Sequence, residues 1–250
     1  MTRRPPHALP ALIAASSGAL ILSIAAGSAQ SQSLTVMPVK VLMSPGQAAT
    51  TLTVVNQSAT EASFQIRVFA WSQGATGDDQ LAASDELVAS PPLGTMAANA
   101  TQVVRLVLRR PPQAREASYR IWLDQIPTAA AAGTVRIALR LSIPVFAEPS
   151  TRIVPRITWR IGGSGDQTYL EAVNDGGRHE AFRDISLASA EGSRFKIEAG
   201  ASPYVLPGAT RRWRILAGGP SLGHVATLHV TAKTDGGVID QPVPVGDRQQ

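Results

Sequence analysis

The sequence predicts an all-β protein with two sandwich domains, and three observations support this. After Gln32, short stretches of alternating or continuous apolar residues follow one another, with Gly, Pro, Asn and Asp between them. No convincing amphipathic helix interrupts them, and short strands separated by turn signals are typical of β-sandwiches. The 250 residues leave room, after an N-terminal leader, for two domains of about 100 residues each.

The expected strands share a period-two or continuously apolar pattern and end at turn-forming residues. They are residues 34–43, 50–56, 63–71, 102–108, 119–125, 134–146, 151–161, 168–174, 181–188, 210–216 and 224–233. We expect the domain boundary near Glu148-Pro149-Ser150, where no flexible Gly/Ser linker occurs. The N-terminal domain then covers residues 30–148 and the C-terminal domain residues 149–250.

Residues 1–29 have the three parts of an export signal. Arg3 and Arg4 are basic, a stretch of apolar and small residues follows, and it ends in Gly-Ser-Ala at Ala29. A membrane anchor is the competing interpretation, but a span needs about 20 apolar residues and serines interrupt this stretch. We therefore expect cleavage near Ala29, export, and no stable membrane insertion of the mature chain.

Composition excludes several classes of function. The chain has no cysteine, which rules out disulfides, thiol chemistry and cysteine-based metal sites. Removal of Arg3 and Arg4 leaves 21 basic against 18 acidic residues, a net charge of +3. This excess suits contact with a carboxylate or an acidic partner, but it is too small to indicate nucleic-acid binding.

Candidate catalytic and metal-ligating groups are few. The mature chain has only His179, His224 and His229, and the last two lie an odd number of positions apart, on opposite faces of a strand. No third ligand and no nucleophile–His–acid grouping accompany them. We therefore predict that the protein is not an enzyme and has no metal or cofactor, and we expect these histidines at the surface or in turns.

The most regular pattern in the chain covers residues 135–145. Val135, Ile137, Leu139 and Leu141 alternate with polar or small residues, and the aliphatic series continues to Val145. Pro144 has no amide N–H for a sheet ladder, which favours an edge strand. An apolar edge can pair with another chain, including a second copy of this one. The alternative is an ordinary strand whose odd-numbered face fills its own core.

Two consecutive motifs resemble the periplasmic pilus-assembly chaperones, the PapD-like family. Residues 119–127 are Tyr-Arg-Ile-Trp-Leu-Asp-Gln-Ile-Pro, and residues 137–146 are Ile-Ala-Leu-Arg-Leu-Ser-Ile-Pro-Val-Phe. The resemblance extends over nearly the whole mature chain and is strongest in the first domain. The ending Leu-Ser-Ile-Pro-Val-Phe-Ala-Glu-Pro at residues 141–149 is similar to the archaic, Csu-type branch of the family.

The resemblance implies two immunoglobulin-like sandwiches arranged as an L, in the periplasm. It also implies that the edge strand fills the open groove of an unfinished pilus or fimbrial subunit, which is then delivered to an outer-membrane usher. Val135, Ile137, Leu139 and Leu141 would be the donated side chains. No cofactor or nucleic acid is implied, and self-association through the donor edge is an expected side reaction.

Members of the family anchor the subunit's terminal carboxylate with two basic side chains. By resemblance, the first-strand position is Lys40, while the donor-strand position falls on Pro144, which carries no charge. Arg120 and Arg140 are the candidate replacements, although Arg140 lies four residues upstream, roughly 13 Å along an extended strand.

Other residues have ordinary structural expectations. We expect the four tryptophans in the sandwich cores, and Glu148 and Asp235 to pair with Arg152 or another base where the domains meet. The four are Trp71, Trp122, Trp159 and Trp213.

Two other functions remain open. A pilus component would normally carry an alternating apolar extension after the signal, but here Gln30-Ser31-Gln32-Ser33 leads directly into a strand. A secreted hydrolase on a sandwich scaffold would need the catalytic grouping that is missing above.

Overall fold

The computed structural model describes residues 34–127, 137–200, 202–217, 222 and 225–246, and these form β-strands and one short 3₁₀ helix. Their strands build two sandwiches, which confirms the predicted fold class. The exact boundary near residue 148 stays a prediction. The predicted signal sequence and Val135 lie outside the described residues.

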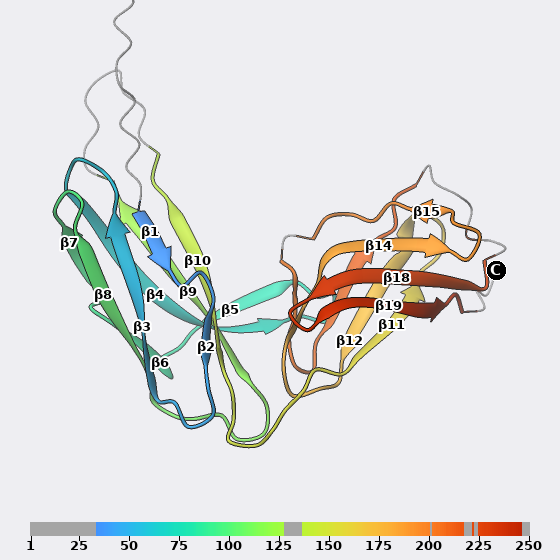
Figure 1. Cartoon of the computed structure of the whole chain (residues 1–250), viewed down its shortest axis with the longest axis horizontal. Coiled ribbons are helices and arrows are strands. Elements are labelled where there is room, and N and C mark those ends of the chain that lie inside the picture. Colours follow the sequence, from blue (N-terminus) through green and yellow to red (C-terminus); the bar gives the residue numbers. More distant parts are fainter. Residues whose placement is uncertain (1–33, 128–136, 201, 218–221, 223–224, 247–250) are drawn as a thin grey trace, which may run out of the picture. The chain divides into compact units, whose positions relative to one another are not determined.

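The first sandwich is made of two sheets (Figure 1). Its strands are β1 (Leu34–Met37), β2 (Val41–Met43), β3 (Ala49–Asn56), β4 (Ala62–Gln73), β5 (Asp79–Ala83), β6 (Leu87–Ser90), β7 (Leu93–Met96), β8 (Thr101–Leu108), β9 (Ala117–Ile126) and β10 (Arg140–Ala147). One sheet has the order β1-β3-β8-β6, and the other has the order β2-β10-β9-β4-β5 with β7 also paired to β4.

The first predicted strand is two strands that belong to different sheets. β1 pairs antiparallel with β3, whereas β2 pairs in parallel with β10. Pro38 lies between them and has no amide N–H to continue the ladder. The chain therefore crosses from one sheet to the other at this point, which brings the start of β2 beside β10.

The core of the first sandwich follows from period-two alternation on both sheets. Leu52 and Val104 from one sheet face Phe64 and Ile121 from the other, and all four side chains are fully buried. Alternate positions of a strand point to the same face, so the apolar positions meet between the sheets.

The second sandwich contains three smaller groups of strands. Its elements are β11 (Ile157–Gly162), a 3₁₀ helix (Gly165–Gln167), β12 (Tyr169–Asn174), β13 (Glu180–Ala181), β14 (Arg183–Ser189), β15 (Arg194–Phe195), β16 (Tyr204–Val205), β17 (Thr210–Arg214), β18 (Thr227–Thr234) and β19 (Gly237–Pro244). The orders are β11-β12-β17, β13-β16 and β15-β14-β18-β19. Trp159, Phe182, Leu170 and Trp213 lie in its core.

A third apolar cluster, here called the junction cluster, joins the two sandwiches. It consists of Trp71, Phe146, Leu206 and Ala209, with Leu81 and Tyr204 packed against it. Gln73 of β4 adds two hydrogen bonds, because its Nε2 donates to the Tyr204 carbonyl at 2.8 Å and its Oε1 accepts from the Leu206 amide at 2.9 Å. At Gly77, in the β4–β5 turn, a Cβ atom would lie 2.8 Å from Arg211 Cα, so only glycine allows this contact.

The expectation that the histidines lie at the surface or in turns is wrong for His179, which is buried. Its Nδ1 lies 2.7 Å from Glu116 Oε1, and its ring stacks on Phe146 with centroids 3.6 Å apart. Glu116 comes from the first sandwich and His179 from the second, so this pair also joins them.

The tryptophan expectation holds in part. Trp159 and Trp213 lie in the second core, but Trp71 is in the junction cluster and Trp122 is half-exposed. Trp122 alternates with buried neighbours on β9, so it points away from the core of the first sandwich.

Several strand limits also differ from expectation. The second domain's first strand begins at Ile157 rather than at residue 151, and the described part of β10 begins at Arg140. The short strands β5, β6, β7, β13, β15 and β16, together with β19, were not predicted. Most of them are too short to show a period, and β19 is largely exposed and contains two prolines.

Candidate functional site

The site begins with the position of β10 in its sheet. Its last residues, Val145–Ala147, lie between β9 and β2, while Arg140–Pro144 pair with β9 alone among the described residues. The edge strand inferred from Pro144 is therefore correct for the first part of β10 and wrong for its last three residues. The physical reason is that β2 joins the sheet only after Pro38.

The aliphatic positions of this segment change environment along its length. Val145 and Ile143 are buried in the first core, and Leu141 packs against that core while half-buried. Leu139 is also half-buried, but Ile137 is 77% exposed. We call residues 137–141 the outer segment and residues 143–147 the inner segment.

The outer segment borders a hollow of about 440 Å³. Gln65 from β4, Asp124 from β9 and Leu139 are among the residues that line it. The Leu139 carbonyl accepts a hydrogen bond from the Gln125 amide at 2.9 Å, so the backbone is paired to β9 even before β10 begins. Leu139 is thus held on a paired backbone beside open space.

Arg140 is engaged within the first sandwich. Asp124 accepts hydrogen bonds from Arg140 Nε and from Arg67 Nη2, the latter at 2.6 Å. Both guanidinium groups also lie over the Trp122 ring, at 4.3 Å and 5.1 Å from its centroid. Burial opposes ionisation of Asp124, but the hydrogen bonds from Arg140 and Arg67 outweigh it and keep the pKa of that carboxyl below its usual value.

Arg120 is engaged at the junction. Its guanidinium lies 3.7 Å from the Trp71 ring centroid and 3.6 Å from Asp79 Oδ2, and its side chain is 12% exposed. Arg120 and Arg140, the candidate replacements for the missing base at Pro144, therefore each have an acidic partner and an aromatic ring within the structure.

Lys40 lies next to Pro144. The parallel register pairs Val145 with Val41, and one step back along both strands places Lys40 beside Pro144. The two positions at which the family resemblance implies basic anchors are therefore neighbours in this fold.

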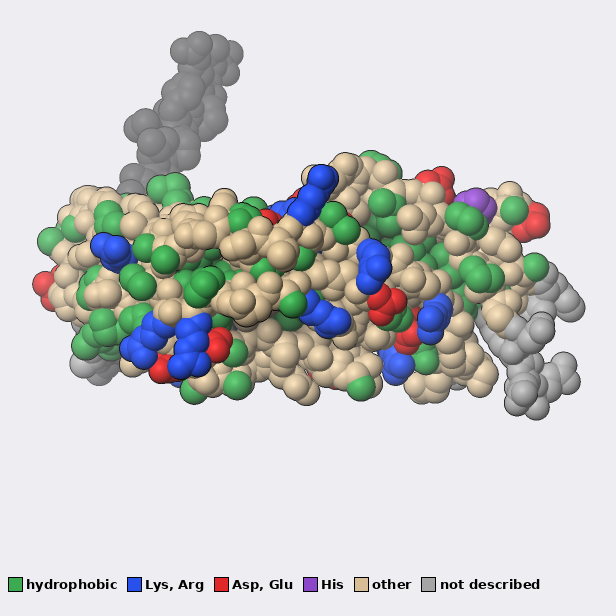
Figure 2. Space-filling model, turned by 90° about the horizontal axis from the view of Figure 1, so that it is seen from below, with side chains coloured by type: hydrophobic (Ala, Val, Ile, Leu, Met, Phe, Trp, Pro, Cys, Tyr) green, Lys and Arg blue, Asp and Glu red, His purple; other side chains and the backbone are tan. Residues whose placement is uncertain are grey.

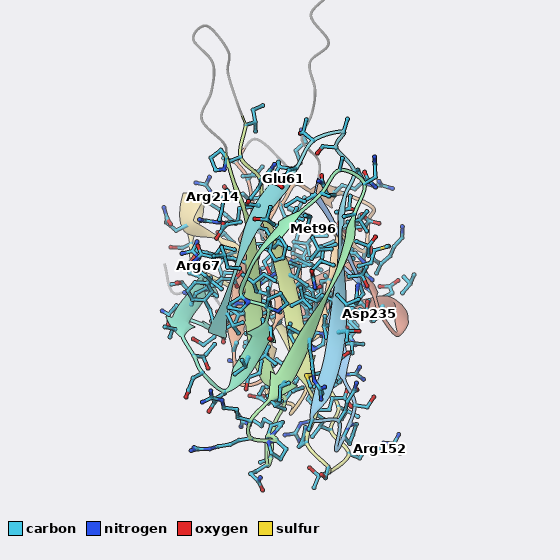
Figure 3. The ribbon with its side chains drawn as sticks, turned by 90° about the vertical axis from the view of Figure 1, so that its left-hand side faces the viewer. Glu61, Arg67, Met96, Arg152, Arg214 and Asp235 are labelled. Carbon is cyan, nitrogen blue, oxygen red and sulfur yellow. The ribbon has the colours of Figure 1, made fainter. Side chains whose placement is uncertain are left out.

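Lys40 is part of a three-charge group that includes the second sandwich. Its Nζ lies 2.5 Å from Asp235 Oδ2, and Arg183 Nη2 donates to Asp235 Oδ1 at 2.8 Å. The hydrogen bonds from Lys40 and then Arg183 lower the pKa of Asp235 to about 2. Figure 3 labels Asp235 on one side of its view and Arg67 on the other, so this group is separate from the one around Asp124.

Both acids that were expected to form ion pairs where the domains meet, Glu148 and Asp235, have basic partners in the structure. Glu148 pairs with Arg178 at 3.1 Å, and Asp235 pairs with Lys40 and Arg183. The predicted base Arg152 is not the partner of either acid. Arg183 could not be predicted as a partner, because its strand, β14, is far from Lys40 in the chain and no sequence pattern connects them.

Charges on the visible surface are mixed. Figure 2 shows Lys and Arg side chains close to Asp and Glu side chains on the face that it displays. Among the described residues, no group of three His, Asp or Glu side chains could hold a metal ion. The described part of the chain also contains no helix long and apolar enough to cross a membrane.

Fold and site together define a class of protein: two β-sandwiches, the first with an aliphatic strand that is partly unpaired at its edge. Residues 33–152 match the family described as "Pili and flagellar-assembly chaperone, PapD N-terminal domain". This segment therefore resembles the N-terminal domain of the pilus-assembly chaperones, as the sequence motifs predict. A search of curated proteins found no match.

Solved structures share the fold. One is from the chaperone–tip adhesion subunit complex CsuC–CsuE of Acinetobacter baumannii, with a TM-score of 0.65, 20% identity, and coverage of 86% of this chain and 100% of that one. The YadV chaperone has a TM-score of 0.61 and 18% identity, with coverage of 85% of this chain and 99% of that one. A chain of the Salmonella enterica SafA pilin–SafB chaperone complex has a TM-score of 0.58 and 17% identity, with coverage of 86% of this chain and 96% of that one. At these identities the likeness establishes the two-domain fold.

Proposed function

We propose that this protein is a periplasmic chaperone that holds pilus or fimbrial subunits by strand donation and delivers them to an outer-membrane usher. The donated residues are Val135, Ile137, Leu139 and Leu141, and Lys40 anchors the subunit's terminal carboxylate. Export requires the signal at residues 1–29, with cleavage near Ala29. The archaic, Csu-type branch is the proposed subgroup.

The observation that carries this proposal is the aliphatic face of the outer segment, which is exposed at Ile137 and half-buried at Leu139 and Leu141. Ile137 is 77% exposed just before the unpaired part of the β10 edge, so a guest strand added there could bury it. The edge of Arg140–Pro144 has no second neighbour strand among the described residues, so its outer side is open to a guest. Strand addition uses this combination of free main-chain groups and alternating side chains.

The free energy available from burying these aliphatic side chains suits a complex that forms and is later released. Full burial of an Ile or Leu side chain is worth roughly 1.5–3 kcal/mol, and most of this remains to be gained at Ile137. Leu139 and Leu141 are already half-buried, so they would add less. Association costs consume part of the sum, which favours a complex that can later be released.

Co-expression with a pilus subunit tests the proposal. The Ile137→Asp, Leu139→Asp double variant should lose the one-to-one complex, because two carboxylates would have to enter an apolar groove. Val238→Asp is the matched control: Val238 is 74% exposed, but it lies on β19 of the second sandwich. Capture by the double variant at the level of the control would remove strand donation from the function.

Export has its own measurement. Mass determination of the protein recovered from a periplasmic extract should give a chain that begins just after Ala29. Recovery of the full 250 residues in the membrane fraction would instead support the anchor interpretation.

A further inference from the structure

Asp235 occupies a position between two bases that come from different sandwiches. Lys40 precedes β2 in the first sandwich, and Arg183 begins β14 in the second. Each base contacts a different oxygen of the same carboxylate, at 2.5 Å and 2.8 Å. Two cations on the two oxygens of one carboxylate is the arrangement that would hold a peptide's terminal carboxylate.

The group carries one positive charge in excess. Lys40 and Arg183 are two cations against the single anion Asp235, and the adjacent pair Asp184–Lys233, 2.7 Å apart, is neutral. An arriving carboxylate therefore meets a site that attracts it, even before Asp235 moves. Arg183 supplies the second charge that Pro144 cannot.

Asp235 is placed so that it can be displaced. It lies in the turn between β18 and β19, and 42% of its side chain is exposed. Its two ion pairs are half-exposed, so solvent can replace them at small cost. Only the side chain has to turn away for both bases to become free.

We propose that Lys40 and Arg183 together form the binding site for a subunit's terminal carboxylate, and that Asp235 occupies this site in the free chain as an internal substitute. This rests on the proposed function, which supplies the subunit. The chain thereby holds its own carboxylate while idle and exchanges it for that of the guest. The exchange also breaks a link between the two sandwiches each time a subunit is bound.

Two synthetic peptides test this exchange. Both are short, N-acetylated and made of alternating Val and Thr; one ends in a free carboxylate and the other in an amide. Binding is followed by NMR on the full mature protein, together with the side-chain carboxyl resonance of Asp235. The acid peptide should bind more tightly than the amide and shift that resonance, while the amide should not shift it.

Three variants sharpen the measurement. Asp235→Asn should bind the acid peptide about three- to tenfold more tightly than the parent does, the range expected when a half-exposed charge competitor is removed. Arg183→Gln in the Asp235→Asn background should reverse this gain. Asp184→Asn is the matched control, since it removes the same charge at the neighbouring residue and should leave the acid-to-amide ratio unchanged.

The proposal is overturned if the acid-to-amide ratio is the same in the parent and in Asp235→Asn, including the case in which neither peptide binds. It is also overturned if Arg183→Gln leaves the ratio unchanged. Failure of the proposed function gives a different result. Subunit capture would then survive the Ile137→Asp, Leu139→Asp change, whatever the peptides do.

Discussion

The outer and inner segments follow one another in a single run of alternating residues, yet their environments are opposite. In the inner segment, Ile143 and Val145 fill the first core and Phe146, on the other face, fills the junction cluster. In the outer segment, Ile137 is exposed just before β10, whose first residues pair with β9 alone among the described residues. The comparison shows that alternation defines which side chains share a face, while packing against the rest of the sandwich core determines whether that face is covered.

The largest expected effect is at Phe146. Phe146→Ala should lower the free energy of unfolding by about 3–5 kcal/mol, because it removes a fully buried ring and its stacking on His179. Urea denaturation measures this. Phe69→Ala, at a half-buried aromatic residue on β4, is the control and should cost less. Equal losses would mean that the inner segment is no better packed than the sheet surface.

Ile143→Ala comes next and compares the two segments along one face. We expect a loss of about 2–4 kcal/mol, the usual cost of truncating a fully buried Ile. Leu141→Ala, two residues earlier and half-buried, should cost about 1 kcal/mol. Urea denaturation of both variants measures the difference. A larger loss of unfolding free energy for Leu141→Ala than for Ile143→Ala would mean that the buried part of the strand begins before Ile143.

The ion pairs of Asp235 lie beside that boundary and predict a smaller, pH-dependent effect. The pKa of Asp235 is lowered from 3.8 to about 2 in the folded chain, so its contribution is complete above the unfolded value. It should be lost as the pH falls from about 4 through about 2. At most about 1 kcal/mol is expected for pairs this exposed.

The measurement is the difference in unfolding free energy between the parent and Asp235→Asn at several pH values. It should be constant above pH 5 and vanish near pH 2, in step with the titration of Asp235. A difference that stays constant through this range would mean that the stabilisation does not come from the ionised carboxylate.

The smallest expected effect is at Ile137. Ile137→Asp should change the free energy of unfolding by less than about 0.5 kcal/mol, because the side chain is already in water. Thermal melting of the variant beside Val238→Asp provides the check. A clear loss of stability at Ile137 alone would show that the outer segment is part of the protein's own core.

Much of the fold could be predicted from particular residues. The alternation in β3, β8 and β9 identified core-facing side chains, and Pro144 indicated the unpaired part of β10. The short strands could not be predicted, because two to five residues show no reliable period. Trp122 and His179 were misplaced, since an aromatic or imidazole side chain suits a core, a junction or a surface equally well by type alone.

The candidate site was only partly predictable, for the same kind of reason. Lys40 and the aliphatic residues 137–141 stand in recognisable motifs, so the sequence indicated them directly. Arg183 and Asp235 meet Lys40 only through contacts between residues far apart in the chain. The residues next to each of them in the sequence do not indicate which distant side chain will be its ion-pair partner.

By itself, the sequence determined the β class, the absence of thiol chemistry and the face on which residues 137–145 carry their aliphatic side chains. These are local properties, because alternation and composition act over a few neighbouring residues. Tertiary structure alone decided where β2 stops pairing with β10. It also decided which aliphatic side chains are packed into the first core, so that Ile143 is buried and Ile137 exposed. It also decided which bases hold Asp235, since such pairings depend on distances that only the folded chain defines.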